Sequence, residues 1–209
     1  DINSKQKKVD KNLVLLLKAD FPWTTKDREY SEKISVKIAE QLHSNGPLKN
    51  SVYFGTATDK PGGKVTLATL VSALLKNNLV GGKVHLFQSD IDDIKTPVEQ
   101  INKLLLIIKQ KLKNENFFLG NKGLRIMFRL IQIVERNKRA STMSIDYEGM
   151  FNDLGQAISH DYIKNLEVFY GEGGANKAAD ELISLLKDKY SEKYSKFERD
   201  LRKIPALSD

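Results

Sequence analysis

Cysteine is absent from this sequence, and histidine is scarce. Without cysteine the chain has no disulfide framework, no thiol chemistry and no cysteine-ligated metal. The three histidines, His43, His85 and His160, lie far apart without the HxxxH or HExxH spacing of a zinc site. The acidic stretch QSDIDD at 88–93 matches no calcium loop and precedes a predicted helix, where acidic residues are common. We therefore expect no bound metal and no cofactor held by this chain alone.

Long apolar runs are also missing. The longest, LVLLL at 13–17 and LLLII at 104–108, are much shorter than the ~18 residues that span a bilayer. They suit helices that pack in a core. We expect a protein without a membrane span, and the lack of cysteine favours the cytoplasm.

What the sequence does have is an excess of positive charge on a globular composition. Its 209 residues are 40% hydrophobic and 29% charged, with a net charge of +7. A chain of this length can bury a core as one large domain or two small ones. The positive charge favours polyanionic partners such as nucleic acid.

Apolar residues at helical spacing predict a mainly α fold. Asp10 is expected to cap the first helix, and Thr96 and Glu99 to form a capping box with Pro97 at the first helical position. We interpret residues 1–209 as a single helical region, with a subdivision near 81–95 as the alternative. Helices are expected over 10–21, 27–42, 66–76, 97–112, 121–137, 146–158, 161–169 and 174–203, the last with a kink near Lys189.

Residues 48–66 predict a small β element. SVYFGTAT is rich in strand-forming residues, DKPGG is typical of a turn, and KVTL suits a returning strand. We therefore expect one β-hairpin beside the helices.

The most basic feature lies on the helix predicted at 121–137. Arg125, Arg129, Gln132 and Arg136 are spaced i, i+4, i+7 and i+11, and we call them the arginine row. Guanidinium groups at this pitch could follow a phosphate backbone and bind it without reading sequence. The alternative is that the row is the solvated face of an amphipathic helix, in which arginine is a good helix former.

A glycine-rich segment at 170–177, YGEGGANK, leads into the last predicted helix. Glycines at a helix start let backbone N–H groups approach an anion, and the helix dipole favours the anion. The segment matches neither a Walker A loop nor a GxGxxG fingerprint, so a tight turn is the alternative. The phosphate-binding candidates are Gly171, Gly173, Gly174, Asn176 and Lys177.

The opening segment, DINSKQKK, is a third candidate for nucleic-acid contact. Its amides at i, i+3 could contact base edges or phosphate oxygens, and the neighbouring lysines add attraction. A polar loop before a helix would have much the same composition. The candidates are Asn3, Lys5, Gln6, Lys7 and Lys8.

Four stretches resemble, in the same order, the motifs of DGQHR-domain proteins. NSKQKKVDKNLVLLL resembles the segment after the signature motif, and ISVKIAEQLHSNG resembles the LAxxIAxxLN helix. KVTLATLVSALL resembles the SLATLVxAL segment, and YGEGGANKAADELISLL resembles the glycine-rich close. The Asp-Gly-Gln-His-Arg signature itself is not in the sequence. We therefore expect it upstream of residue 1 and interpret the chain as the C-terminal portion of a longer protein.

The resemblance implies a function in DNA modification. The family is similar to the ParB and sulfiredoxin-like group and includes the DndB-type proteins of DNA phosphorothioate modification. It is associated with DNA binding, transcriptional control and, in some members, nucleotide hydrolysis. For this chain the resemblance implies the helical C-terminal region of an α+β protein. The residues that match the family pattern are Asn3, Gln6, Gly171, Gly173 and Gly174.

We therefore expect a regulatory DNA-binding protein that contacts DNA phosphates through its basic helix faces. The alternative is an enzyme component that hydrolyses a nucleotide or processes DNA. Its active centre would lie mostly in the expected N-terminal half, so no catalytic residue is assigned in this chain. A third hypothesis is a helical assembly scaffold that forms homo-oligomers without contacting nucleic acid.

Overall fold

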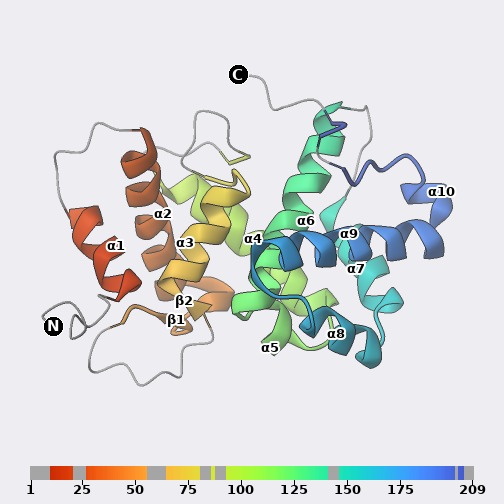
Figure 1. The fold of residues 1–209 in the computed structure, drawn as a ribbon, viewed down its shortest axis with the longest axis horizontal. Coiled ribbons are helices and arrows are strands. Elements are labelled where there is room, and N and C mark those ends of the chain that lie inside the picture. The colour runs from red at the N-terminus through yellow and green to blue at the C-terminus, as the bar shows by residue number, and fades with distance from the viewer. Residues whose placement is uncertain are drawn as a thin grey trace, which may run out of the picture.

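The computed structural model describes residues 10–20, 27–55, 65–80, 86–87, 93–140, 146–200 and 202–204. Over these residues the chain is mainly helical with a small two-stranded sheet, which confirms the predicted fold class (Figure 1). In chain order the elements are α1 (Lys11–Asp20), α2 (Asp27–Ser44), the 3-10 helix η2 (Gly46–Leu48), β1 (Val52–Tyr53), β2 (Val65–Thr66), α3 (Leu67–Lys76), α4 (Lys95–Lys111), α5 (Glu115–Phe118), α6 (Asn121–Ala140), α7 (Tyr147–Ala157), α8 (His160–Glu167), α9 (Gly171–Lys189) and α10 (Ser191–Tyr194).

The helices form one connected core. Figure 1 shows α1, α2 and α3 at one end of the molecule and α7 to α10 at the other. Between them, α3 packs on α6 and α2 packs on α4, so helices before and after residues 81–95 share buried apolar residues. α6 also packs on α9, and α4 packs on α7.

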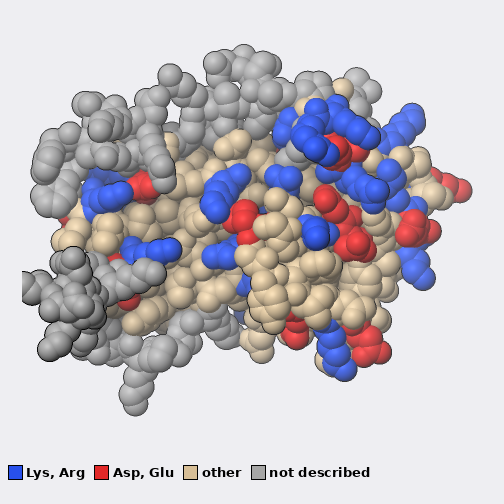
Figure 2. Space-filling view, in the orientation of Figure 1, with Lys and Arg blue, Asp and Glu red and all other residues tan. Residues whose placement is uncertain are grey.

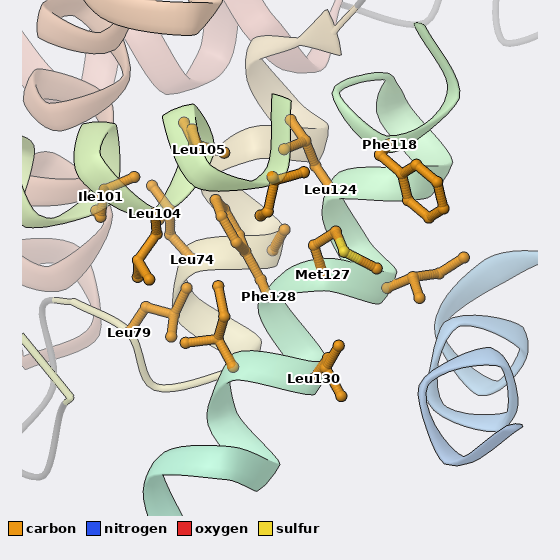
Figure 3. Close-up of a cluster of buried hydrophobic side chains, with 14 of the residues drawn as sticks. Leu74, Leu79, Ile101, Leu104, Leu105, Phe118, Leu124, Met127, Phe128 and Leu130 are labelled. Carbon is orange, nitrogen blue, oxygen red and sulfur yellow. The ribbon is translucent and has the colours of Figure 1, made fainter. Parts of the chain in front are cut away.

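α6 is buried along most of its length because apolar residues occupy several of its faces. Figure 3 shows Phe128 of α6 near Leu74 of α3 and Leu105 of α4, and all three side chains are buried. Burying a side chain of this size stabilises the fold by roughly 1.5–3 kcal/mol. This packing fixes α6 as the helix from which the arginine row projects.

Two side-chain oxygens, one from α1 and one from α6, accept hydrogen bonds from backbone N–H groups at the start of α3. Asn12 Oδ1 of α1 accepts a hydrogen bond from the N–H of Ala68 at 2.9 Å. Asn121 Oδ1 of α6 accepts one from the N–H of Thr66, also at 2.9 Å, and the Thr66 hydroxyl caps α3 itself. These bonds satisfy N–H groups that have no partner within the helix. Asp10 in turn accepts from the N–H of Asn12 at 2.8 Å, which confirms its predicted capping role.

The two strands run parallel, so the predicted β-hairpin is wrong. Val52 of β1 lies opposite Val65 of β2, in parallel register, whereas a hairpin is an antiparallel pair. The predicted turn falls within residues 56–64, which lie outside the described residues. The strand-forming residues predicted where both strands lie, but they did not predict the direction of β2. That direction is set by α3. The strand continues directly into that helix, whose start is bonded to α1 and α6.

The predicted capping box at the start of α4 is also wrong. The helix begins at Lys95, after Ile94, so Thr96 lies inside the first turn and cannot cap it. The N-cap residue, Ile94, forms no side-chain capping hydrogen bond.

The last long helix differs from its prediction at both ends. α9 begins at Gly171, so the glycine-rich segment forms its first turn, and it ends at Lys189. Tyr190 has φ −136° and ψ 54°, which breaks the helix, and α10 follows as a separate short element. The chain beyond α10 returns to α6 instead of extending α9 to residue 203, because Glu198 bonds to Asn137.

Candidate functional site

The arginine row of α6 is half-buried rather than solvated. Arg125 Nη2 donates a hydrogen bond to Thr69 Oγ1 of α3 at 3.3 Å. Arg129 Nη1 donates to Gln132 Oε1 at 2.7 Å, and Gln132 itself is buried. The guanidinium groups therefore have different neighbours and do not form one exposed face.

Arg129 lines a cavity of about 490 Å³ between α6, α9 and the chain after α10. We call this space the α6–α9 cavity. Arg129 belongs to the arginine row and Lys177 to the glycine-rich segment, so the cavity brings together two basic features that were predicted separately. The lining residues are Arg129, Lys177, Arg199 and Arg202, the acidic Asp180, Glu181 and Asp200, and Phe169.

Side chains of α6 hold the C-terminal segment beside this cavity. Asn137 is buried, and its Oδ1 accepts from the N–H of Glu198 at 2.8 Å while its Nδ2 donates to the Glu198 carbonyl at 2.7 Å. Arg136 Nη2 donates to the carbonyl of Ile204 at 2.6 Å. These bonds anchor the segment on both sides of its two arginines and so place them at the cavity. Arg136, predicted to contact nucleic acid, thus has a partner within the molecule.

The glycine-rich segment owes two of its glycines to backbone geometry. Gly171 has a φ of +65°, which favours glycine. A Cβ on Gly174 would lie 2.8 Å from the backbone carbonyl carbon of Phe169. Of the phosphate-binding candidates in this segment, the cavity lining includes Lys177 but neither the glycines nor Asn176.

Two buried polar atoms on residues that line the cavity are unpaired. Arg129 Nε and Asp180 Oδ1 have no hydrogen-bond partner among the described residues. Burial lowers the pKa of Arg129 and raises the pKa of Asp180, and each group's charge opposes the shift of the other. Buried charged groups without full partners are costly. An anion beside the Arg129 guanidinium would stabilise its positive charge, although it would also repel the carboxylate of Asp180.

The remaining cations at the cavity differ in their pairing. Arg202 Nε and Nη2 each donate to a carboxylate oxygen of Asp200 at 2.9 Å, and these bonds lower the pKa of Asp200 to about 2. Arg199 Nη1 donates to Ser184 Oγ at 2.9 Å. Neither Arg199 nor Lys177 forms an ion pair with a carboxylate of the described residues, and both are exposed. These two side chains are therefore the ones most available to an anion.

Basic and acidic side chains lie close together on the surface around this cavity. Figure 2 shows Lys and Arg atoms concentrated over α6, α9 and α10 on the face viewed, with Asp and Glu atoms among them. The surface is thus a mixture of charges with local basic patches, and not an unbroken basic stripe on this face.

Some residues of the cavity were not among the sequence candidates, and some sequence candidates lie outside the described residues. The cavity residues that the sequence did not point to are Phe169, the acidic Asp180, Glu181 and Asp200, and the basic Arg199 and Arg202. The last two lie in FERDLRK at 197–203, whose alternating charges were taken into the predicted long helix. The opening candidates Asn3, Lys5, Gln6, Lys7 and Lys8 lie outside the described residues.

A metal centre does not emerge from the described residues, in which no three His, Asp or Glu side chains are grouped to hold an ion. His43 has a structural role, because its Nδ1 accepts from the N–H of Val52 at 3.3 Å and its ring meets Phe54 edge-on. None of the described helices has the length and apolar character to cross a membrane.

Comparison of the chain with protein-family models, with curated proteins and with solved structures gave no match. The chemistry of the α6–α9 cavity and the motif resemblance are therefore the features that bear on its function.

Proposed function

We propose that this protein binds DNA and holds a backbone phosphate in the α6–α9 cavity. The observation that carries the proposal is the convergence of Arg129, Lys177, Arg199 and Arg202, from three parts of the chain, on one cavity. Guanidinium and ammonium groups are effective ligands of phosphate oxygens. The net charge of +7 would also attract a polyanion over a distance.

The positions of these cations suggest how one phosphate would be held. Arg129 lines the cavity and is half-buried, so its guanidinium suits the innermost contact. Lys177, Arg199 and Arg202 are exposed and would contact the same phosphate or its neighbours along the strand. Contacts of this kind position a protein on DNA without reading its sequence.

The DNA-modification context of the proposal comes from the motif resemblance. DGQHR-domain proteins are associated with phosphorothioate modification and with control of its genes. We accordingly propose a regulatory, cytoplasmic protein of a phosphorothioation-like system. The cavity would supply affinity, and any recognition of sequence or modification would need contacts beyond it.

The test is the affinity for a fluorescein-labelled 20-base-pair duplex, measured by fluorescence anisotropy. The variant K177A/R199A/R202A removes three exposed cations of the cavity, and K95A/K103A/K113A removes three exposed lysines of α4 and the residues after it. We expect the cavity variant to bind at least about tenfold more weakly, and the control to lose less than about threefold. Equal losses of duplex affinity in the two variants would show that only net charge matters. They would reject the α6–α9 cavity as the phosphate site.

Nucleotide binding is the second candidate function, and the size of the cavity favours it. At about 490 Å³ the space lies within the roughly 300–1,000 Å³ of small-ligand sites. Phe169 beside the cations offers an apolar ring for a base. If ATP or GTP binds without DNA and the cavity variant abolishes that binding, the nucleotide function is favoured. Phosphate release from the bound nucleotide would then decide between a binding protein and a nucleotide-hydrolysing enzyme.

A further inference from the structure

A second hollow, of about 1030 Å³, lies among α1, α2 and α3 and includes Arg125 of α6. We call it the α1–α3 groove. Its described lining shares no residue with the α6–α9 cavity, so the proposed DNA contact does not account for it.

One face of α1 lines this groove with two aliphatic side chains between two lysines. Lys11, Val14, Leu15 and Lys18 are spaced i, i+3, i+4 and i+7, which places them on a single helical face. Val14 is 38% exposed although it is apolar. The face has the pattern of a helix that packs against another helix along an aliphatic stripe.

The α3 side of the groove continues the aliphatic surface. The half-buried Leu75 lines it, together with Val71 one turn earlier and Val80 beyond the helix, which are both buried. None of the described lining residues is aromatic. In the region of Figure 2 that corresponds to α3, uncharged surface is bordered by separate Lys and Arg patches.

The lining of the groove carries an excess of positive charge. Lys11, Lys18, Lys76 and Arg125 line it against the single described acid, Glu32. Lys18 pairs with Glu32 at 3.2 Å, and Lys76 pairs at 3.2 Å with Glu172, outside the groove. Both lysines are at least half exposed, so these pairs are weak and exchangeable.

We propose that the α1–α3 groove docks an amphipathic helix with an aliphatic stripe flanked by carboxylates, presented by a partner protein. The stripe would cover Val14, Leu15 and Leu75, beside the already buried Val71. Lys11 and Lys18 are seven residues apart on α1, a rise of about 10.5 Å. Carboxylates one heptad apart on the incoming helix would meet both lysines, with Arg125 and Lys76 available to a third.

Helix docking accounts for the lining better than a small ligand or DNA does. The exposed Val14 and the half-buried Leu15 and Leu75 favour apolar packing along two helix faces, which is how grooves take up amphipathic helices. A duplex phosphate backbone would leave Val14 uncovered. An aromatic base would find no aromatic partner among the described lining residues.

The experiment uses the whole chain and two labelled eighteen-residue peptides in fluorescence anisotropy. Both peptides carry leucines at i, i+3, i+4 and i+7 positions. One has glutamates a heptad apart beside the stripe, and the other has lysines there. We expect the acidic peptide to bind at least about tenfold more tightly than the basic one, because opposite charges across an interface favour the correct partner.

Matched variants locate the binding on one face of α1. Val14→Glu alters the groove face, whereas Leu17→Glu alters a 51% exposed residue of the same helix that does not line the groove. We expect Val14→Glu to weaken the acidic peptide at least about tenfold and Leu17→Glu less than about threefold. If Val14→Glu does not fold by circular dichroism, the exposed Lys11→Glu replaces it with the same expectation.

Several outcomes would overturn the proposal. Equal binding of the two peptides, or equal effects of the two glutamate variants, would contradict it. So would loss of duplex binding or of self-association in Val14→Glu without loss of peptide binding, because these results assign the groove to DNA or to a second copy. The variant K177A/R199A/R202A should keep full peptide affinity, which separates this proposal from the DNA-binding one.

Discussion

The side-chain amide of Asn137 on α6 forms two hydrogen bonds with the backbone of Glu198, at 2.8 Å to its N–H and 2.7 Å to its carbonyl. A buried side chain thus fastens the C-terminal segment to the central helix and carries two arginines to the α6–α9 cavity. The positions of Arg199 and Arg202 at the cavity depend on this attachment.

Replacing Asn137 by Ala should loosen that segment. Two backbone groups of Glu198 lose their partner, and we expect a loss of about 2 kcal/mol in the free energy of unfolding. Duplex affinity should fall with it, because Arg199 and Arg202 are no longer held at the cavity. Urea unfolding measures the first effect and anisotropy the second. Asn152→Ala, an exposed asparagine on α7, is the control and should change neither.

Asn12 connects α1 to the start of α3 through its bond to the N–H of Ala68. Asn12→Ala removes a buried acceptor from a helix N-terminus, and we expect a loss of about 1–2 kcal/mol in the free energy of unfolding. Asn12→Asp keeps the acceptor oxygen and should lose less. Equal losses in the two variants, by thermal or urea unfolding, would contradict a capping role.

Asp200 should titrate at unusually low pH. Its bidentate bond from Arg202 lowers its pKa to about 2, against an ordinary value of about 3.9. Because the folded-state pKa is the lower one, the stabilising contribution is present above about pH 4 and is lost as the pH falls towards 2. Carboxyl-carbon NMR should find this pKa in the wild type and a return towards about 4 in Arg202→Gln. A wild-type value near 4 would refute the pairing.

Gly173 and Gly174 form a matched pair in the first turn of α9. A Cβ at Gly173 meets open space, so Gly173→Ala should be neutral or stabilising by up to about 1 kcal/mol. Gly174→Ala would press on the backbone of Phe169 and should destabilise the protein. Unfolding curves of both variants decide the matter. If Gly173→Ala also keeps full duplex affinity, a Cβ at that position does not hinder DNA binding.

The long helices were predictable because their apolar spacing is independent of what they pack against, whereas the four-residue α5 and the separate α10 were not predicted. α6 is an example, since Leu124, Phe128 and Ile131 recur at helical intervals and all are buried. The environment of the arginine row was not predictable. Whether Arg129 faces solvent depends on where α9 and the C-terminal segment lie, and helical spacing within α6 does not encode that.

The cavity itself depends on contacts between distant parts of the chain. The alternating charges at 197–203 fit a solvated helix as well as they fit the observed return to α6. What decides between them is Tyr190, which leaves the helical conformation, and Asn137, which captures Glu198. The direction of β2 could not be predicted either, because it is set by the hydrogen bonds that hold the start of α3 to distant parts of the chain.

The most direct test of the central claim is the salt dependence of duplex binding. Each phosphate contact contributes about 0.9 to the slope of log K against log salt concentration. We predict that K177A/R199A/R202A lowers the magnitude of the wild-type slope by about 0.9 if its cations share one phosphate and by up to about 2.7 if they contact three, while K95A/K103A/K113A leaves it nearly unchanged. The same slope for the cavity variant and the wild type would contradict a phosphate site at the α6–α9 cavity.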